Sequence, residues 1–286
     1  MGDPLAAPAP GPLAPALWLG TSSWSHDSWA GLIYPPGTPS GEYIRHYAQR
    51  FPTVEIDATF YRTPTASMIA AWKERTPPGF LFAAKAPQVI THEKLLAGCE
   101  AELDQFLSVM QGLGERLGPI LFQFRYFRKG EMAPADFLAR LVPFLDRLPR
   151  GGFRFVVEIR NKTWVTPALL DVLASRGVAL AWIDHPWFWD PEALLARPGA
   201  RSAAFAYVRW LGDRVAIEKV TREWNRTVVD RTARLRAWAR ALRAALPQEV
   251  PIFGYFNNHF AGCAIESVDL FARLWRESGA EAAGGG

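Results

Sequence analysis

Short apolar runs alternate with amphipathic stretches along almost the whole chain of 286 residues. The runs are near-continuous and rich in β-branched or aromatic residues, which is typical of strands that are buried on both faces. Eight such runs, each followed by a stretch of helical character, predict a single closed (β/α)8 barrel, the TIM-barrel form of the α/β class. The expected strands are Leu17–Gly20, Val54–Ile56, Phe80–Ala84, Ile120–Phe124, Phe153–Ile159, Val178–Ile183, Ala204–Trp210 and Ile252–Phe256.

The helices between these runs carry their own start and stop signals. Ser40 is a suitable N-cap, Pro134 suits a first helical turn, and Gly177 ends a helix. The alternative fold is an open doubly wound sheet, but no GxGxxG or GxxxxGK[ST] motif follows a strand. The expected helices are Ser40–Arg50, Thr65–Arg75, Glu100–Leu117, Pro134–Leu148, Pro167–Ser175, Pro191–Leu195, Thr227–Leu246 and Ala261–Glu277.

The two ends of the chain have the composition of tails. Residues 1–15 are rich in Pro and Ala and predict a disordered segment, residues 16–277 the barrel, and residues 278–286 a flexible tail. Cys99 and Cys263 are far apart and fit no disulfide or zinc pattern. No apolar run approaches the roughly 20 residues of a membrane span, and the start lacks the basic residues of a signal peptide. We therefore expect a cytoplasmic protein without a membrane partner; the oligomeric state is left open.

Polar side chains gather at the carboxyl ends of the expected strands. Each of the eight strands delivers at least one, whereas the opposite strand ends are introduced mainly by Gly and Pro. A barrel stabilised by packing alone has no reason to concentrate polar groups at one end, because burying them is costly unless they are paired. The pattern predicts a site at this end of the barrel, where such folds build their active sites. The residues are Thr21, Ser22, Glu55, Asp57, Lys85, His92, Gln123, Glu158, Arg160, Asp184, His185, Arg209, Asn257, Asn258 and His259.

Three of these residues are our candidates for catalysis: Glu158, Lys85 and His92. Glu158 and Arg160 point the same way, because strand side chains repeat every two residues. They form either a structural ion pair or an acid/base with a partner that holds an anion. Lys85 either pairs with Glu55 or serves as an electrophile or anion anchor. His92 is either a loop-stabilising donor or a second proton carrier.

A metal site is the weaker interpretation of the same residues. Asp184 and His185 suit a divalent metal together with Glu158, but no HxH or HExxH spacing supports it. We therefore expect no cofactor, with a divalent metal as the minor alternative. Asn257 either orients a substrate or, with Asn258, caps the last helix.

Two further features bear on the choice of ligand. The formal net charge is +4, and six arginines lie in residues 226–243, which indicate either a solvated helix face or a patch for nucleic acid. Aromatic residues are frequent in or beside the strand-end loops, where they either pack the loops or line a site for a sugar, a base or another flat group. These aromatic residues are Trp24, Trp29, Phe60, Tyr61, Trp164, Trp187, Trp189 and Trp210.

Seven segments of the chain resemble, in order and spacing, the YecE-like family, catalogued as domain of unknown function 72. They are WLGTSSWSHDSWAGLIYPPG, TVEIDATFYRTP, FLFAAKAPQVITH, LGPILFQF, FVVEIRNKTW, YVRW and YFNNH, within residues 17–275. The resemblance implies a TIM barrel and no established activity. It also implies a site lined by Glu55, Thr59, Tyr61, Lys85, His92, Gln123, Glu158, Arg160, Arg209 and Asn257.

The chain departs from the family pattern at four places. The family usually has LFQLPP where residues 121–126 read LFQFRY, Asn in place of Asp57, and His in place of Leu211. It also has an Asn-Ala pair where residues 264–268 read AIESV. The departures alter the loop after the fourth strand and the wall beside Arg209.

Three hypotheses for function follow. The first is an enzyme, a hydrolase, lyase or isomerase, that acts by acid/base chemistry on an anionic or sugar-like small molecule. Glu55, Thr59, Tyr61, Gln123, Arg160, Asp184, Arg209, Asn257 and Trp24 would bind its substrate. The second is a protein that binds or processes nucleic acid, and the third is a barrel that binds a small ligand without turnover.

Overall fold

The structure, a computed structural model, describes residues 16–284, excluding the side chains of residues 281–284. The expected disordered segment, residues 1–15, lies outside the described residues. Among the described helices, none combines the length and the apolar character that crossing a membrane requires.

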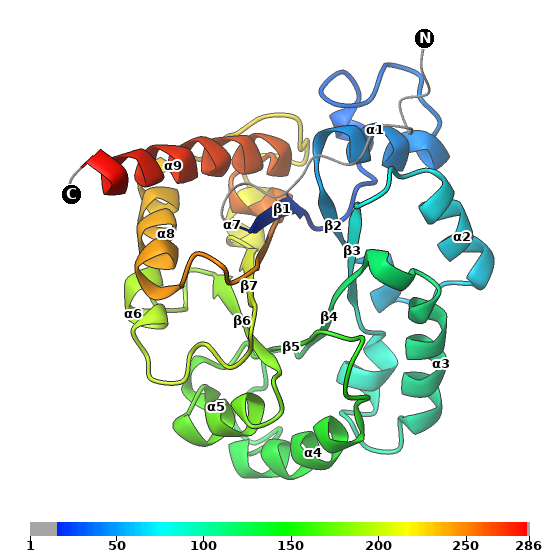
Figure 1. The fold of residues 1–286 in the computed structure, drawn as a ribbon, viewed down its shortest axis with the longest axis vertical. Coiled ribbons are helices and arrows are strands. Elements are labelled where there is room, and N and C mark those ends of the chain that lie inside the picture. Colours follow the sequence, from blue (N-terminus) through cyan, green and yellow to red (C-terminus); the bar gives the residue numbers. More distant parts are fainter. Residues whose placement is uncertain (1–15, 285–286) are drawn as a thin grey trace.

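Eight parallel strands form a barrel, which confirms the predicted fold (Figure 1). The strands are hydrogen-bonded in the order β1-β8-β7-β6-β5-β4-β3-β2. A parallel bridge between Ser22 and Glu55 joins the two outer strands of that order and completes the ring. The strands are β1 (Leu17–Thr21), β2 (Thr53–Ile56), β3 (Leu81–Lys85), β4 (Leu117–Gln123), β5 (Phe155–Glu158), β6 (Ala179–Asp184), β7 (Ala206–Trp210) and β8 (Ile252–Phe256).

Helices surround the strands, as Figure 1 shows. They pack on the outward side chains of the barrel, such as Leu19, Val157 and Val208, in one large apolar core. The helices are α1 (Tyr43–Arg50), α2 (Ala66–Glu74), α3 (Glu100–Gln111), α4 (Pro134–Arg147), α5 (Pro167–Ala174), α6 (Pro191–Leu195), α7 (Arg214–Glu218), α8 (Thr232–Ala245) and α9 (Ala264–Gly284).

Three helices differ clearly from their predicted ranges. α3 ends at Gln111 rather than at 117, because Gly114, with a left-handed φ of 59°, follows it and Leu117 already begins β4. α8 begins at Thr232 rather than at 227, because the backbone N–H groups of Val228 and Val229 bond to the carbonyl of Ala261 and hold that segment against the loop after β8. α9 continues to Gly284, through residues predicted as a tail, and its Ser278 accepts a hydrogen bond from Arg243 of α8. The alanines and glutamate in this stretch are favourable helix formers.

The two-residue repeat of the strands explains how the polar residues reach the barrel mouth. A second apolar cluster fills the barrel interior with inward side chains such as Ala83, Leu121, Val156, Tyr207 and Tyr255. The next inward position on each of these strands is two residues later, at or beyond the strand end. These positions hold Lys85, Gln123, Glu158, Arg209 and Asn257.

The closure between β1 and β2 depends on a close backbone approach at Gly20. A Cβ on Gly20 would lie 2.1 Å from the carbonyl oxygen of Thr53. The Tyr47 hydroxyl crosslinks the same junction: it accepts from the backbone N–H of Thr21 at 2.8 Å and donates to the carbonyl of Thr53 at 3.1 Å. The junction therefore leaves no room for a side chain at position 20.

We expect Gly20→Ala to lower the free energy of unfolding by about 2–3 kcal/mol, because the methyl group forces β1 and β2 apart. Gly41→Ala is the matched control, since no atom lies within 4 Å of the added Cβ at that position. Urea unfolding of both variants measures the difference, and equal stabilities would contradict this account of the closure.

Candidate functional site

A buried arginine joins two buried glutamates across the barrel mouth. Arg209 of β7 donates from Nη2 to Oε1 of Glu55 on β2 at 2.7 Å and from Nη1 to Oε2 of Glu158 on β5 at 2.6 Å. Both carboxylates are fully buried, and the guanidinium is 3% exposed. One side chain thus ties together three strands that are not neighbours in the sheet.

The remaining carboxylate oxygens are also occupied. Oε2 of Glu55 accepts from the Tyr207 hydroxyl at 2.6 Å, and Oε1 also accepts from Ser22 Oγ at 2.9 Å. Oε1 of Glu158 accepts from Nε of Arg160. By contrast, the Nε of Arg209 is buried and has no partner among the described residues. The cluster therefore has one buried donor to spare and no spare carboxylate oxygen.

This arrangement fixes the charge of Glu158. Burial alone would raise the pKa of Glu158, but the positive charges of Arg160 and Arg209 outweigh it and lower the pKa to about 2. A carboxylate that remains ionised and fully hydrogen-bonded is poorly suited to move protons near neutral pH. The geometry favours a role in holding the two arginines over the general acid/base role that we predicted.

Arg160 is the partly exposed member of the cluster, at the surface of the mouth. Its side chain is 27% exposed, and its terminal nitrogens have no hydrogen-bond partner among the described residues. It lines a cavity of about 240 Å³ at the ends of β4, β5 and β6. The other lining residues are Gln123, Arg125, Tyr126, Ile183, His185, Trp187 and Phe188.

Lys85 and His92 meet at the ring of Phe60 beside this cluster. The Nζ of Lys85 lies 3.7 Å from the ring centroid, and the His92 ring packs edge-on at 4.9 Å. Lys85 forms its ion pair with Asp57, at 3.3 Å, and not with Glu55 as one interpretation of the sequence expected. Burial lowers the pKa of Lys85, and the carboxylate of Asp57 offsets only part of this effect.

His92 is held by an unusual piece of backbone. It lies in a single π-helical turn, Val89–Glu93, and the next residues, Leu95 and Leu96, have left-handed φ angles of 46° and 69°. Such turns and strained residues are frequent at functional sites. Burial, followed by the charges of Lys85 and Arg125, lowers the pKa of His92 to about 4, so the ring is neutral near pH 7.

Other predicted site residues have structural contacts. Thr59 is buried and donates to the carbonyls of Ile56 and Lys85, which ties the ends of β2 and β3 together. Gln123 lines the cavity and also donates to the carbonyl of Phe124 at 2.6 Å. Trp24 packs edge-on against Trp72, 5.5 Å between ring centroids.

The last strand end is occupied by capping interactions. Asn257 accepts the backbone N–H of His259 at 2.9 Å, and Asn258 accepts that of Ala264 at the start of α9 at 2.9 Å. Tyr61, at the end of β2, is 69% exposed and packs edge-on against Phe60. We therefore assign Asn257 a capping contact and leave Tyr61 at the rim of the mouth.

The structure places Asp184 away from the mouth. Its carboxylate accepts from Arg234 Nε at 2.7 Å and from the Trp238 indole, both on α8. Ile183 is the inward residue at this end of β6, and Asp184 faces the helices, so its carboxylate points away from Glu158 and His185. In the described part of the chain, no three His, Cys, Asp or Glu side chains are grouped so as to hold a metal.

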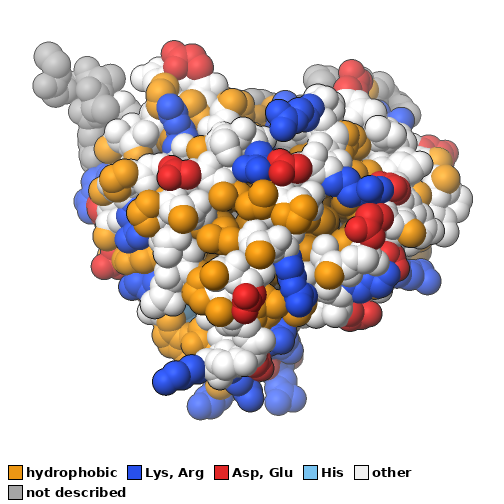
Figure 2. Space-filling model, turned by 90° about the horizontal axis from the view of Figure 1, so that it is seen from below, with side chains coloured by type: hydrophobic (Ala, Val, Ile, Leu, Met, Phe, Trp, Pro, Cys, Tyr) orange, Lys and Arg blue, Asp and Glu red, His pale blue; other side chains and the backbone are white. Residues whose placement is uncertain are grey.

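Arginines in and beside α8 form ion pairs or pack on aromatic rings, as expected of a solvated helix face; the nucleic-acid patch stays a prediction. Figure 2 shows a different face, the one at the bottom of Figure 1 around α4 and α5, and there basic and acidic side chains are interspersed. The contacts are Arg234 with Asp184 and Asp190, Arg236 with Glu277 at 3.9 Å, Arg240 with Glu192 at 4.0 Å, and Arg231 over Phe260 at 5.7 Å.

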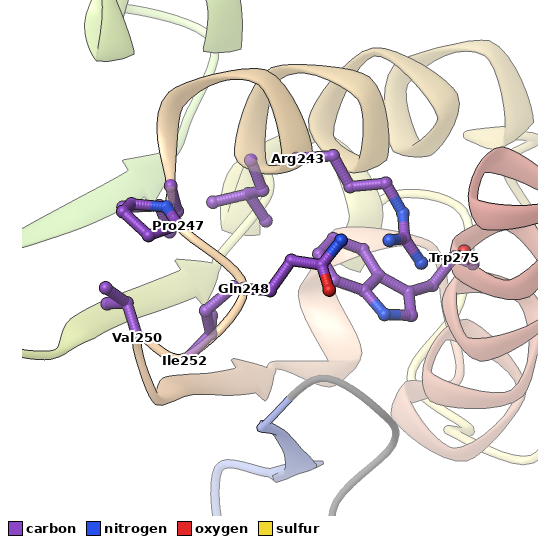
Figure 3. Close-up of a pocket in the computed structure, with 8 residues that line it drawn as sticks. Arg243, Pro247, Gln248, Val250, Ile252 and Trp275 are labelled. Atoms are coloured by element: carbon purple, nitrogen blue, oxygen red, sulfur yellow. Dashed lines mark hydrogen bonds between the residues drawn. The ribbon is translucent and has the colours of Figure 1, made fainter. Parts of the chain in front are cut away.

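Another pocket lies at the opposite end of the barrel, where α8 leads into β8 (Figure 3). It has a volume of about 120 Å³. Its one charged side chain, Arg243, lies 4.0 Å from the ring centroid of Trp275 and donates to Ser278 at 2.9 Å. This pocket has the character of packing between α8 and α9.

Residues 18–284 match the family described as Protein of unknown function DUF72. The chain belongs to the DUF72 family. This confirms the family resemblance predicted from the sequence.

Relatives and solved structures agree with this assignment. The chain is 31% identical over 186 residues to the UPF0759 protein YecE of Escherichia coli K12, covering 64% of this chain and 62% of that protein. It is 26% identical over 269 residues to YunF of Bacillus subtilis, covering 88% and 92%. The crystal structure of a DUF72 family protein from Thermotoga maritima has a TM-score of 0.67 at 21% identity, covering 92% of this chain and 98% of that one. The last likeness supports the fold alone.

Sequence reasoning missed several members of the site: Tyr207 in the buried cluster, and Arg125, Tyr126, Ile183 and Phe188 in the lining of the cavity. Tyr207 stands two residues before Arg209 on the same strand, so the strand repeat was a usable signal that it also points inward. Tyr126 lies beyond the fourth strand and was noted only as part of a departure from the family.

We expect Arg209→Met to lower the free energy of unfolding by about 3–5 kcal/mol, because two buried carboxylates lose their shared cation. Arg214→Met, at a pair whose arginine side chain is 76% exposed, should change it by less than about 1 kcal/mol. Adding Glu55→Gln and Glu158→Gln to Arg209→Met should restore part of the loss. Denaturant unfolding tests all three; no loss in Arg209→Met would show that the bridge is not structural.

We also expect His92 to stay neutral in the folded protein down to a pH of about 4, measured by NMR titration of its ring protons. Unfolded chains protonate histidine near pH 6.5. His92 therefore contributes stability above that pH, and the contribution is lost as pH falls toward 4. Lys85→Met should raise the pKa of His92 without restoring 6.5, because burial remains; an unchanged pKa would place Lys85 too far away to act on it.

Proposed function

We propose that this DUF72 protein is an enzyme that acts by acid/base chemistry on a small anionic, sugar-like molecule bound at the carboxyl end of the barrel. The observation that supports this most directly is Arg160. Glu158 fixes its Nε, while its terminal nitrogens remain available beside a cavity of about 240 Å³. A fixed guanidinium with available donors suits a carboxylate or phosphate group.

The size and lining of the cavity support the rest of the ligand description. Binding pockets for drug-sized ligands are roughly 300–1,000 Å³, so this cavity suits a unit of monosaccharide size. Tyr126 and Trp187 offer exposed ring faces, 56% and 73% exposed, and Gln123 offers an amide. Aromatic faces beside a few polar groups fit the two sides of a sugar ring.

We assign the chemistry to Lys85 and His92, which lie at and after the end of β3, next to β4, and not in the lining of the cavity itself. His92 is neutral near pH 7 and can take a proton from a bound molecule, while the Lys85 ammonium stabilises negative charge that develops beside it. Glu158, Arg209 and Glu55 act one step back, by fixing where Arg160 lies. Hydrolase, lyase and isomerase chemistry all remain consistent with these groups.

The test is calorimetric binding of D-glucuronate, glucose 6-phosphate and their neutral parent, glucose. The wild type should bind at least one of the two anions, and Arg160→Met should weaken that binding by about 10- to 100-fold, as expected for a lost hydrogen bond to a charged group. Arg176→Met is the matched control, because that arginine lies at the outer end of α5 and pairs with Asp146 at 2.8 Å.

Turnover separates an enzyme from a barrel that only binds. With a substrate found among the ligands that bind, His92→Gln and Lys85→Met should each lower kcat by about 10²–10⁴ while binding persists. Binding without turnover in the wild type would favour the non-catalytic hypothesis. Binding that is equal for glucose and both anions, or that survives Arg160→Met, would remove the proposed anion site.

A further inference from the structure

A second hollow adjoins the cavity at the barrel mouth. It is a groove of about 570 Å³ along the loops after β4 and β5. Tyr126 lines both hollows. The residue before it lines only the cavity, and the residue after it lines only the groove. Arg125 and Arg160 line the cavity, whereas Phe127, directly after Tyr126, and Asn161, directly after Arg160, line the groove. The two hollows are therefore neighbours, with Tyr126 at their common edge.

The wall between the two hollows is held rigidly. The Asn161 side chain accepts the backbone N–H of Phe127 at 2.9 Å and donates to its carbonyl at 2.8 Å. Phe127 in turn stacks on Trp164, 5.0 Å between centroids. Arg125 donates to Glu131 at 2.6 Å and closes the loop beyond Tyr126. Tyr126 is thus 56% exposed, and the hydrogen bonds and ring stacking of its neighbours hold its backbone in place.

The charges of the groove differ from those of the cavity. The cavity offers Arg160 and Arg125 and no carboxylate in its lining. The groove is lined by Arg128 and Lys129, but also by Asp136 and by Glu131, whose carboxylate accepts the backbone N–H of Arg128 at 2.9 Å. Two cations beside two carboxylates suit neutral hydroxyl groups better than a second anion.

We propose that the groove is a second binding subsite, and that the ligand is a disaccharide that carries one anionic group. Its charged unit occupies the cavity at Arg160, and its neutral unit lies beyond Tyr126 in the groove. This proposal rests on the proposed function, because the cavity must first hold the anionic unit. The two hollows together fall in the range of roughly 300–1,000 Å³ that is usual for binding pockets.

The experiment compares single sugars with disaccharides that carry the same charge. The calorimetric pairs are glucose 6-phosphate with trehalose 6-phosphate, and glucuronate with glucuronyl-β-1,4-glucose. In the wild type, at least one disaccharide should bind ten-fold or more tightly than its single-sugar partner. Thr163→Tyr fills the groove from an exposed position and should reduce that ratio to about one. Ser108→Tyr, at an exposed position on α3, is the control and should keep the ratio.

The outcomes separate this proposal from the one on which it rests. If single sugars bind and neither disaccharide binds more tightly, the subsite is wrong and the anion site stands. A ratio that Thr163→Tyr leaves unchanged likewise contradicts the subsite, because the extra unit then lies elsewhere. If none of the four compounds binds, the anion site fails, and the subsite fails with it.

Discussion

The charge of Arg209 is the interaction on which the barrel mouth depends. Two carboxylates, those of Glu55 and Glu158, are fully buried within the ring of strands, where a carboxylate needs a cation as its partner. Arg209 supplies it to both, and burial, which by itself would lower the pKa of this arginine, is outweighed by the two carboxylates, so the guanidinium stays charged. Apolar residues of similar volume often stabilise a core equally well. The retention of such a cluster at a barrel mouth is therefore better explained by what it positions than by stability.

What the cluster positions is Arg160. One oxygen of Glu158 accepts a hydrogen bond from Arg209 and the other accepts one from Arg160. The buried Arg209 therefore fixes the Glu158 carboxylate, and this carboxylate fixes the partly exposed Arg160. Electrostatic recognition is most effective when the charged donors are fixed before the ligand arrives. Elsewhere at the mouth, the ring of Phe60 contacts both Lys85 and His92 and helps to hold them in place. In the proposed function, Arg160 is thus the fixed anion-binding edge, and Lys85 and His92 are the separate pair that transfers protons.

The fold could be predicted from the sequence because strand and helix repeats are local patterns. Each apolar run is long enough to be recognised as a strand without knowledge of its partners. It also predicted that polar side chains gather at the barrel mouth, since polar residues at strand ends need only a strand assignment. It did not reveal which polar side chains meet. Asp184 and Arg209 stand at equivalent ends of neighbouring strands, yet one faces α8 and the other the barrel. Their difference is a shift of one residue in strand register, which sequence boundaries do not resolve. Likewise, the acid/base role predicted for Glu158 took no account of Arg209. That arginine is distant in sequence but hydrogen-bonds to the Glu158 carboxylate.

The departures from the family pattern gain a physical meaning from these positions. Where the family usually has two prolines after Leu-Phe-Gln-Leu, this chain has Arg125 and Tyr126, and both line the cavity beside Arg160. Leu211, in place of a usual His, is 8% exposed and packs in the barrel interior, where an imidazole would need a partner. The buried bridge of Glu55, Arg209 and Glu158 consists of residues that the family pattern shares, whereas the cavity wall contains residues that it does not. Under the proposed function, the residues that hold Arg160 in place and the residues that select the ligand are therefore different, so a change in ligand would require no change in the buried charges.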